Sequence, residues 1–241
     1  MTDNQYSNEV KDFYNASYKN LGFDAQRKYP NEALCRFMGR NFFSIPTATR
    51  KEMNILETGS GSGANLWMIA KEGFSAYGLD ISEESISLCK EMLTNYHVCA
   101  DLYVQDMTEI SCVSNNYFDA VVDVFSSYCL TKSQGADYLR RVAQILKLGG
   151  LFFSYFPSKR SDAYQFPETA QLIDSDTLNS ILRTDSPFNG QLYPFRFMHP
   201  REYEGALTKL GFEIQYSEIV GRTYHNSKEY FEFVVIEAKK T

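Results

Sequence analysis

The sequence predicts a doubly wound α/β fold, and three observations carry that prediction. Short apolar runs recur through residues 50–157 and alternate with helical patterns, which is typical of a parallel sheet covered on both faces. One of these runs, Ile55-Leu56, leads into a glycine-rich turn and then a helix. The chain ends in two further apolar runs joined by a polar loop. We therefore expect a Rossmann-like core that ends in a hairpin.

The glycine-rich turn after the first predicted strand indicates a ligand site. Gly59, Gly61 and Gly63 follow Glu57, which stands at the end of the strand. Glycine lets the backbone turn tightly and approach a ligand, and the helix that follows offers unpaired N–H groups. A dinucleotide fingerprint would have the spacing G-x-G-x-x-G, with a pyrophosphate on the helix N-terminus. The carboxylate of Glu57 suits a cationic ligand better than a pyrophosphate.

Two further strands are predicted to end in acids. Residues 76–80 form the second strand, and Asp80 lies 23 residues after Glu57, close to the spacing of a ribose-binding acid in nucleotide-binding βαβ units. Ser82 is the better N-cap for the next helix, which favours ligand contact for Asp80. Residues 102–107 form the third strand, whose end carries a second acid and a methionine.

The remaining predicted elements complete the sheet. Residues 117–125 are almost continuously apolar, as expected for a strand covered on both faces. The next helix is expected to end at a glycine cap within residues 146–150. The later elements are a fifth strand over 151–156, a helix from Pro200 to Gly211, strands over 212–220 and 230–238, and a polar loop between these two strands.

This ordered series resembles the class I S-adenosylmethionine-dependent methyltransferases. The resemblance rests on the E-x-G-x-G-x-G motif at residues 57–63, on the acids that follow it and on the terminal hairpin. It is clear over about residues 50–158 and present in outline over 200–238. It implies a mostly parallel seven-stranded sheet with an antiparallel C-terminal strand. It also implies S-adenosylmethionine as the methyl donor and S-adenosylhomocysteine as the product.

The resemblance carries a set of cofactor-binding residues with it. Glu57 and the glycines would hold the methionine moiety and its amine, Asp80 the ribose, and Asp106 the amino group of adenine. Tyr29 would belong to a lid, because it precedes a helix expected to begin at Pro30. The predicted cofactor-binding residues are Glu57, Gly59, Gly61, Gly63, Asp80, Ile81, Asp106, Met107, Phe125 and Tyr29.

Methyl transfer from S-adenosylmethionine requires few catalytic side chains. The sulfonium already activates the methyl group, so the protein must align the acceptor and exclude water. A general base is needed only for a hydroxyl or a protonated amine. His199 is the candidate base, because a modest pKa shift would suffice, although hydrogen bonding in the turn before Pro200 is a competing role. Tyr155 is the second catalytic candidate, to orient the acceptor, with simple packing as its alternative. No metal site is predicted.

The sequence lacks the signatures of specialised acceptors. Residues 125–128, after the fourth strand, contain neither N/D-P-P-Y/F nor a Pro-Cys pair, which leaves a small molecule with oxygen as the predicted acceptor atom. Basic residues around the predicted insertion indicate a polar and anionic acceptor, since arginine pairs with carboxylates and phosphates. Ordinary ion pairing with nearby acids explains them as well. They are Lys159, Arg160, Arg183, Arg196 and Arg201.

The composition argues against several other classes of protein. The 241 residues contain no apolar run of the ~18 residues that span a membrane, and no signal peptide is recognised at the N-terminus. Five cysteines without a C-x-x-C pair indicate a cytoplasmic protein rather than a disulfide or zinc framework. The net charge of −6 makes nucleic acid an unlikely partner.

We expect an N-terminal helical lid region over residues 1–50 and a methyltransferase domain over 51–241, with a substrate-side, lid-like insertion at 158–200. The alternatives are a small-molecule N-methyltransferase, an NAD-dependent oxidoreductase, an aminopropyltransferase and a non-catalytic S-adenosylmethionine-binding regulator. The glycine spacing and the terminal hairpin argue against the oxidoreductase. The sequence leaves the acceptor and the oligomeric state open.

Overall fold

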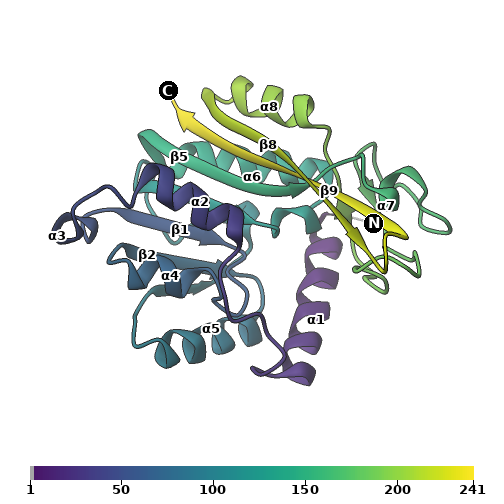
Figure 1. Cartoon of the computed structure of the whole chain (residues 1–241), viewed down its shortest axis with the longest axis horizontal. Coiled ribbons are helices and arrows are strands. Elements are labelled where there is room, and N and C mark those ends of the chain that lie inside the picture. Colours follow the sequence, from purple (N-terminus) through teal and green to yellow (C-terminus); the bar gives the residue numbers. More distant parts are fainter. Residues whose placement is uncertain (1–2) are drawn as a thin grey trace.

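The computed structural model describes residues 3–241 and confirms the predicted fold class (Figure 1). Seven strands form one sheet in the order β3-β2-β1-β4-β5-β9-β8. β9 is antiparallel to both of its neighbours, whereas the pairs among β1 to β5 are parallel. The strands are β1 (Asn54–Thr58), β2 (Ser75–Asp80), β3 (Asp101–Val104), β4 (Phe118–Val124), β5 (Leu146–Pro157), β8 (Phe212–Tyr224) and β9 (Glu229–Lys240).

Helices cover the sheet on both faces. In Figure 1, α2 and α4 lie in front of the sheet and α6 lies behind it, while α8 contacts β8 and β9. The central strands are accordingly buried, and Val121, Val122 and Phe153 have no exposed surface. The helices are α1 (Asp3–Leu21), α2 (Glu32–Asn41), α3 (Thr47–Arg50), α4 (Leu66–Lys71), α5 (Glu83–Asn95), α6 (Lys132–Ile145), α7 (Asp162–Gln165) and α8 (Pro200–Lys209), with short 3-10 turns η1 (Met107–Glu109) and η2 (Ser127–Cys129).

Local sequence signals explain most of the helix boundaries. Ser82 caps α5 as predicted, because its hydroxyl accepts the Ser85 N–H. The prediction that α2 begins at Pro30 is wrong by two residues. The side chain of Asn31 accepts the N–H groups of Ala33 and Leu34, so the helix starts at Glu32.

The prediction that the helix between the fourth and fifth strands ends at a glycine cap is also wrong. α6 ends at Ile145, and residues 146–150 already belong to β5, where Leu146 pairs with Phe118. Gly149 has a φ of +79°, and the register between the two strands shifts next to this pair. Gly149 and Gly150 therefore lie at an irregularity within β5, because Leu146 before them already pairs with β4.

The terminal hairpin is longer than predicted. β8 continues through residues 221–224, which the sequence placed in a loop, and pairs with β9 as far as Tyr224 and Glu229. The pairing of β5 with β9 stops at Pro157 and Phe233. The tip of the hairpin therefore extends beyond the end of β5, on the side where the parallel strands end.

The insertion after β5 folds against this tip. It contains α7 and a two-stranded pair of β6 (Thr177–Leu178) and β7 (Phe195–Arg196). Phe195 and Phe197 are fully buried and pack against Phe231 of β9. No helix within residues 3–241 combines the length and apolarity that a membrane crossing requires.

Candidate functional site

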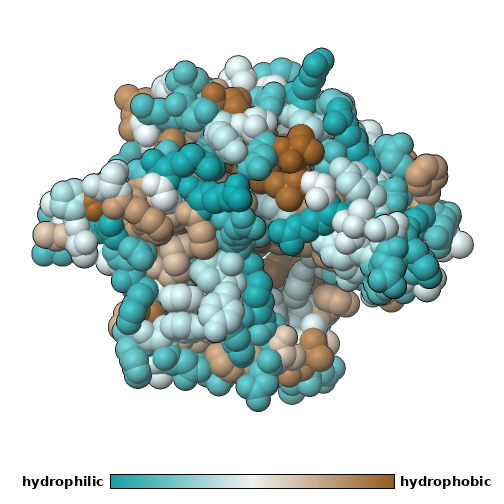
Figure 2. Space-filling model, in the orientation of Figure 1, coloured by the Kyte–Doolittle hydropathy of each residue, from teal (hydrophilic) through white to brown (hydrophobic). Residues whose placement is uncertain are grey.

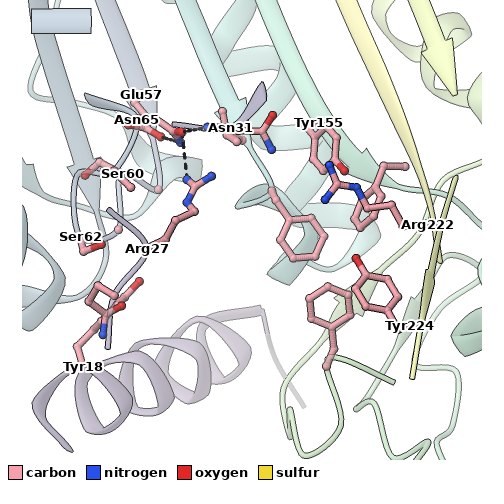
Figure 3. A pocket seen from close by; sticks show the side chains of 18 residues that line it. Tyr18, Arg27, Asn31, Glu57, Ser60, Ser62, Asn65, Tyr155, Arg222 and Tyr224 are labelled. Atoms are coloured by element: carbon pink, nitrogen blue, oxygen red, sulfur yellow. Dashed lines mark hydrogen bonds between the residues drawn. The ribbon is translucent and has the colours of Figure 1, made fainter. Parts of the chain in front are cut away.

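A cavity of about 380 Å³ opens at the carboxyl ends of the parallel strands. In Figure 2 this face of the molecule is hollowed near its centre, beside α1. The glycine loop after β1 forms one wall, and aromatic side chains with one arginine form the opposite wall (Figure 3). The lining includes Tyr18, Arg27, Asn31, Glu57, Gly59, Gly61, Asn65, Phe125, Tyr155, Phe188, Arg222, Tyr224 and Phe233.

Glu57 lies fully buried at the end of β1, and one of its two carboxylate oxygens is hydrogen-bonded. Asn65 Nδ2 donates a 2.6 Å hydrogen bond to Glu57 Oε1, and Glu57 Oε2 has no partner among the described residues. Asn65 Oδ1 in turn accepts from Arg27 Nη2 at 3.0 Å and from the Asn31 N–H at 2.8 Å. Burial raises the pKa of the Glu57 carboxyl to about 8. A cationic group in the cavity would supply the missing partner.

The three glycines after Glu57 have different structural roles. Gly59 has a φ of +66°, and a Cβ there would collide with the Ser126 side chain, so only glycine fits. The Gly61 N–H donates to Asp80 Oδ2 at 2.9 Å, which ties the loop to the end of β2. Gly63 does not line the cavity; its missing Cβ makes room for Cys89 of α5.

A smaller hollow of about 90 Å³ adjoins this cavity, and several of the other predicted cofactor-binding residues line it. It is lined by Asp80, Ile81, Met107 and Phe125. Asp80 is buried, which raises the pKa of its carboxyl. Phe125 has a φ of +56°, a strained backbone at the end of β4. The hollow is small because α1 covers it with Val10, Tyr14 and Tyr18.

Asp106 lies one step further along the same edge. Its carboxylate accepts from Ser7 Oγ of α1 at 2.9 Å and from the Thr108 N–H at 2.8 Å. It lines a neighbouring depression together with Ile81 and Met107. The structure thus brings Glu57, Gly59, Gly61, Asp80, Ile81, Asp106, Met107 and Phe125 together along one continuous edge.

Tyr29 does not join this group. Its side chain is 71% exposed and lines none of these cavities. The indole of Trp67 donates to the Lys28 carbonyl at 3.0 Å, and this anchor turns Arg27 and Asn31 toward the cavity while Tyr29 faces outward. Tyr18 of α1 borders both cavities in its place.

The two catalytic candidates have different surroundings. Tyr155 lines the large cavity, and burial raises the pKa of its hydroxyl, so the group stays protonated at neutral pH. It can donate a hydrogen bond but is not a base. His199 is the N-cap residue of α8, its carbonyl accepts the Tyr203 N–H, and its side chain lies outside the cavity wall.

The basic residues of the insertion do not line the cavity either. Lys159 pairs with Asp176 at 2.7 Å, and Arg183 pairs with Glu229 at 2.8 Å. Arg196 is buried over the Phe156 ring and contributes to the interior. Ion pairing and packing therefore account for these three side chains. Among residues 3–241, no cluster of three or more His, Cys, Asp or Glu could hold a metal ion.

The sequence did not single out several residues that line the cavity, among them Arg27, Asn31, Asn65, Arg222 and Tyr224. The N-cap pattern of Asn31 was a usable signal, since asparagine before a helical stretch indicates a helix start. The alternation of Val220, Arg222 and Tyr224 was another, because a spacing of two places side chains on one face of a strand.

Comparison with known proteins identifies a domain in this part of the chain. Residues 55–150 match the family model described as "Methyltransferase domain". The chain is similar to "Putative methyltransferase YqeM" of Bacillus subtilis (strain 168), with 29% identity over 194 residues that cover 70% of this chain and 77% of that protein. A relative with the same description from Geobacillus sp. (strain WCH70) is 32% identical over 99 residues, and the chain spans 39% of its length.

Solved structures share the fold. A SAM-dependent methyltransferase from Methanosarcina mazei superposes with a TM-score of 0.62 at 21% identity, over 78% of this chain and 92% of that one. The 1,6-didemethyltoxoflavin-N1-methyltransferase of Burkholderia thailandensis, which holds its substrate and S-adenosylhomocysteine, superposes with a TM-score of 0.64 at 14% identity, over 100% and 91% of the two chains.

Proposed function

We propose that the chain is a class I S-adenosylmethionine-dependent methyltransferase that methylates an oxygen atom of a small polar molecule. The observation that most strongly supports donor binding is Glu57 Oε2, a buried oxygen at the edge of the cavity that has no partner in the described part of the chain. The amine of the donor is a cation of the kind that this oxygen lacks. The cavity beyond it has room for an acceptor.

The residues along the strand ends have natural roles in this proposal. Glu57 with Gly59 and Gly61 would hold the methionine amine, and Arg27 on the same wall would pair with the methionine carboxylate. Asp80 would bind the ribose hydroxyls. Asp106 would accept from the adenine amino group, once Ser7 gives up its bond to that carboxylate.

S-adenosylmethionine supplies a methyl group that its sulfonium has already activated. The acceptor oxygen forms the new bond to the methyl carbon, the carbon–sulfur bond breaks, and the hydroxyl proton passes to water. The aromatic wall of Phe125, Phe188 and Phe233 would shield the transferred methyl group from bulk solvent on one side. Tyr155 keeps its proton and can orient the acceptor by donating a hydrogen bond. His199 lies outside the cavity wall, so in this scheme water and not His199 accepts the hydroxyl proton.

A nitrogen acceptor is the competing hypothesis, because the didemethyltoxoflavin enzyme shares the fold and is named for a nitrogen position. Its substrate is also a small molecule, which supports that class of acceptor here. Product analysis by mass spectrometry separates an O-methyl ether or ester from an N-methyl amine.

Calorimetric titration with S-adenosylmethionine, S-adenosylhomocysteine and NAD tests donor binding. We expect the first two to bind and Asp80→Ala to abolish binding. Asp101→Ala, an exposed acid at the opposite end of β3, should leave binding intact. Preference for NAD, or no binding of either methionine-derived ligand, would overturn the proposal. Binding without methyl transfer to any acceptor in a broad screen would favour the non-catalytic regulator.

A further inference from the structure

The wall opposite the glycine loop is built by the hairpin tip that projects beyond β5. Arg222 and Tyr224 stand two residues apart on β8, and both line the cavity. Figure 3 shows the Arg222 guanidinium close to Tyr155, across the cavity from Glu57 and Arg27. Arg222 also lines the adjoining groove with Asn31 and Tyr155, so it stands at the mouth of the cavity.

Arg222 is an exposed cation without a partner among the residues that the structure describes. Within residues 3–241, no side chain or carbonyl accepts a hydrogen bond from its guanidinium, and no carboxylate lies within 4.0 Å of it. This sets it apart from Arg27, which donates to Asn65, and from Arg183, which pairs with Glu229. Among the described residues that line the cavity, Glu57 is the one carboxylate, and it lies on the opposite wall; Glu32 and Glu218 line the adjoining groove.

The surface beside Arg222 is aromatic, and its rings meet at angles from 22° to 72°. Tyr155 and Phe233 stack with ring centroids 4.6 Å apart, and Phe125 packs on Phe233 at 5.5 Å and on Phe188 at 5.1 Å. Such a wall stabilises a planar apolar ligand through ring contacts. A guanidinium at its edge pairs best with a carboxylate, which it can hold with two parallel hydrogen bonds.

We propose that the methyl acceptor is an aromatic carboxylate, whose ring lies against the aromatic wall of Phe125, Phe188 and Phe233 and whose carboxylate is bound by Arg222. This inference rests on the proposed methyltransferase function and names its substrate class. A hydroxyl elsewhere on the ring receives the methyl group: its oxygen bonds to the methyl carbon, the carbon–sulfur bond of the donor breaks, and the hydroxyl proton passes to water. The carboxylate is unchanged in the product.

The test is calorimetric titration in saturating S-adenosylhomocysteine, with hydroxybenzoates and hydroxycinnamates compared against their primary amides. Each pair differs only in the anionic group. We expect at least one acid to bind, and to bind about tenfold or more tightly than its amide. Arg222→Gln should reduce this ratio to near one. Arg201→Gln, which removes an exposed arginine of α8 outside the cavity, should leave the ratio unchanged.

Three outcomes would overturn the inference: amides that bind as tightly as the acids, no binding by any acid, or a preference for acids that survives in Arg222→Gln. These failures are separable from a failure of the proposed function. If S-adenosylhomocysteine itself does not bind, the methyltransferase proposal falls. If it binds and the acids do not, only the substrate class is wrong.

Discussion

Asn65 holds one oxygen of Glu57 at 2.6 Å, and the other oxygen, fully buried, has no partner within residues 3–241. The same amide accepts from Arg27 and from the Asn31 backbone, so one side chain connects the segment before α2 to the acid at the end of β1. Burial outweighs the hydrogen bond from Asn65, and the pKa of the Glu57 carboxyl rises to about 8. The ligand-free site is thus prepared for a cation.

The first prediction concerns the pH dependence of stability in the ligand-free protein. The pKa of the Glu57 carboxyl is about 8 in the folded state, whereas in the unfolded state it has its ordinary value of about 4.5. Between these values the folded state holds more protons, so this group's contribution to the free energy of unfolding falls as pH rises. We expect a loss approaching 1.4 kcal/mol per pH unit within that window, measured by urea unfolding between pH 5 and 8.

Glu57→Gln should remove this component, because an amide does not titrate. Glu91→Gln, on the exposed face of α5, is the matched control and should keep the wild-type slope. Parallel pH curves for the wild type and Glu57→Gln would show that Glu57 is ionised throughout and that the buried oxygen already has a counterion.

The second prediction concerns Asn65 as a positioning residue. Asn65→Ala removes the donor to Glu57 and the acceptor for Arg27 and Asn31. We expect the dissociation constant of S-adenosylhomocysteine to rise about tenfold, since three hydrogen bonds that order this wall of the cavity are lost. Calorimetry checks this, and Asn8→Ala on the exposed side of α1 serves as control. An unchanged constant would mean that the wall orders itself on ligand binding.

The sequence was sufficient for the sheet and for the edge at which three strand-end acids gather, because both follow from local patterns. Apolar runs followed by Glu57, Asp80 and Asp106 marked three strand ends, and parallel strands bring their ends to one edge. The opposite wall could not be found that way. Arg222 and Tyr224 belong to β8 only because β9 pairs with them, and polar residues on an exposed strand resemble a loop.

The prediction of a helix end at residues 146–150 was wrong for a related reason. A leucine-lysine-leucine stretch before two glycines fits a helix end, but pairing with β4 recruits it into β5. The position of Tyr29 depends on anchors more distant still, because Trp67 fixes the Lys28 carbonyl across 39 residues of sequence. Tertiary contacts of this kind leave no local pattern to detect.

The third prediction concerns three tyrosine hydroxyls that bond one another above the site. Tyr14 of α1 lies 2.7 Å from Tyr128 and 3.0 Å from Tyr193, and the last two lie 2.7 Å apart. They join α1, η2 and the insertion. Tyr193→Phe should lower the free energy of unfolding by about 1 kcal/mol, because it leaves buried hydroxyls underbonded. Tyr14→Phe combined with it should cost less than the sum of the single changes.

Thermal or urea unfolding measures these effects, and Tyr216→Phe provides the control. The Tyr216 hydroxyl bonds to Glu218 on the outer part of the hairpin, so its loss should change stability by less than about 0.5 kcal/mol. Strict additivity of the Tyr14 and Tyr193 changes would show that the three hydroxyls do not act as one network.

The fourth prediction compares two glycines inside helices. Gly135 of α6 lies directly under the buried Arg196 guanidinium, and a Cβ at this position would overlap it. Gly205 of α8 has open space around the equivalent position. Alanine is the better helix former by about 0.5–1 kcal/mol, so Gly205→Ala should stabilise the protein by up to that amount. Gly135→Ala should instead destabilise it by about 1–3 kcal/mol, the usual range for overpacking.

Arg196 itself provides the decisive control for Gly135. Its guanidinium packs over the Phe156 ring at 4.9 Å and donates to the Ser127 carbonyl at 3.4 Å, so it has little freedom to move aside. Arg196→Gln shortens the side chain and should cost less stability in the Gly135→Ala background than in the wild type, because the clash has gone. Equal costs in the two backgrounds would show that the guanidinium relaxes away from the new methyl group, and that Gly135 is required for some other reason.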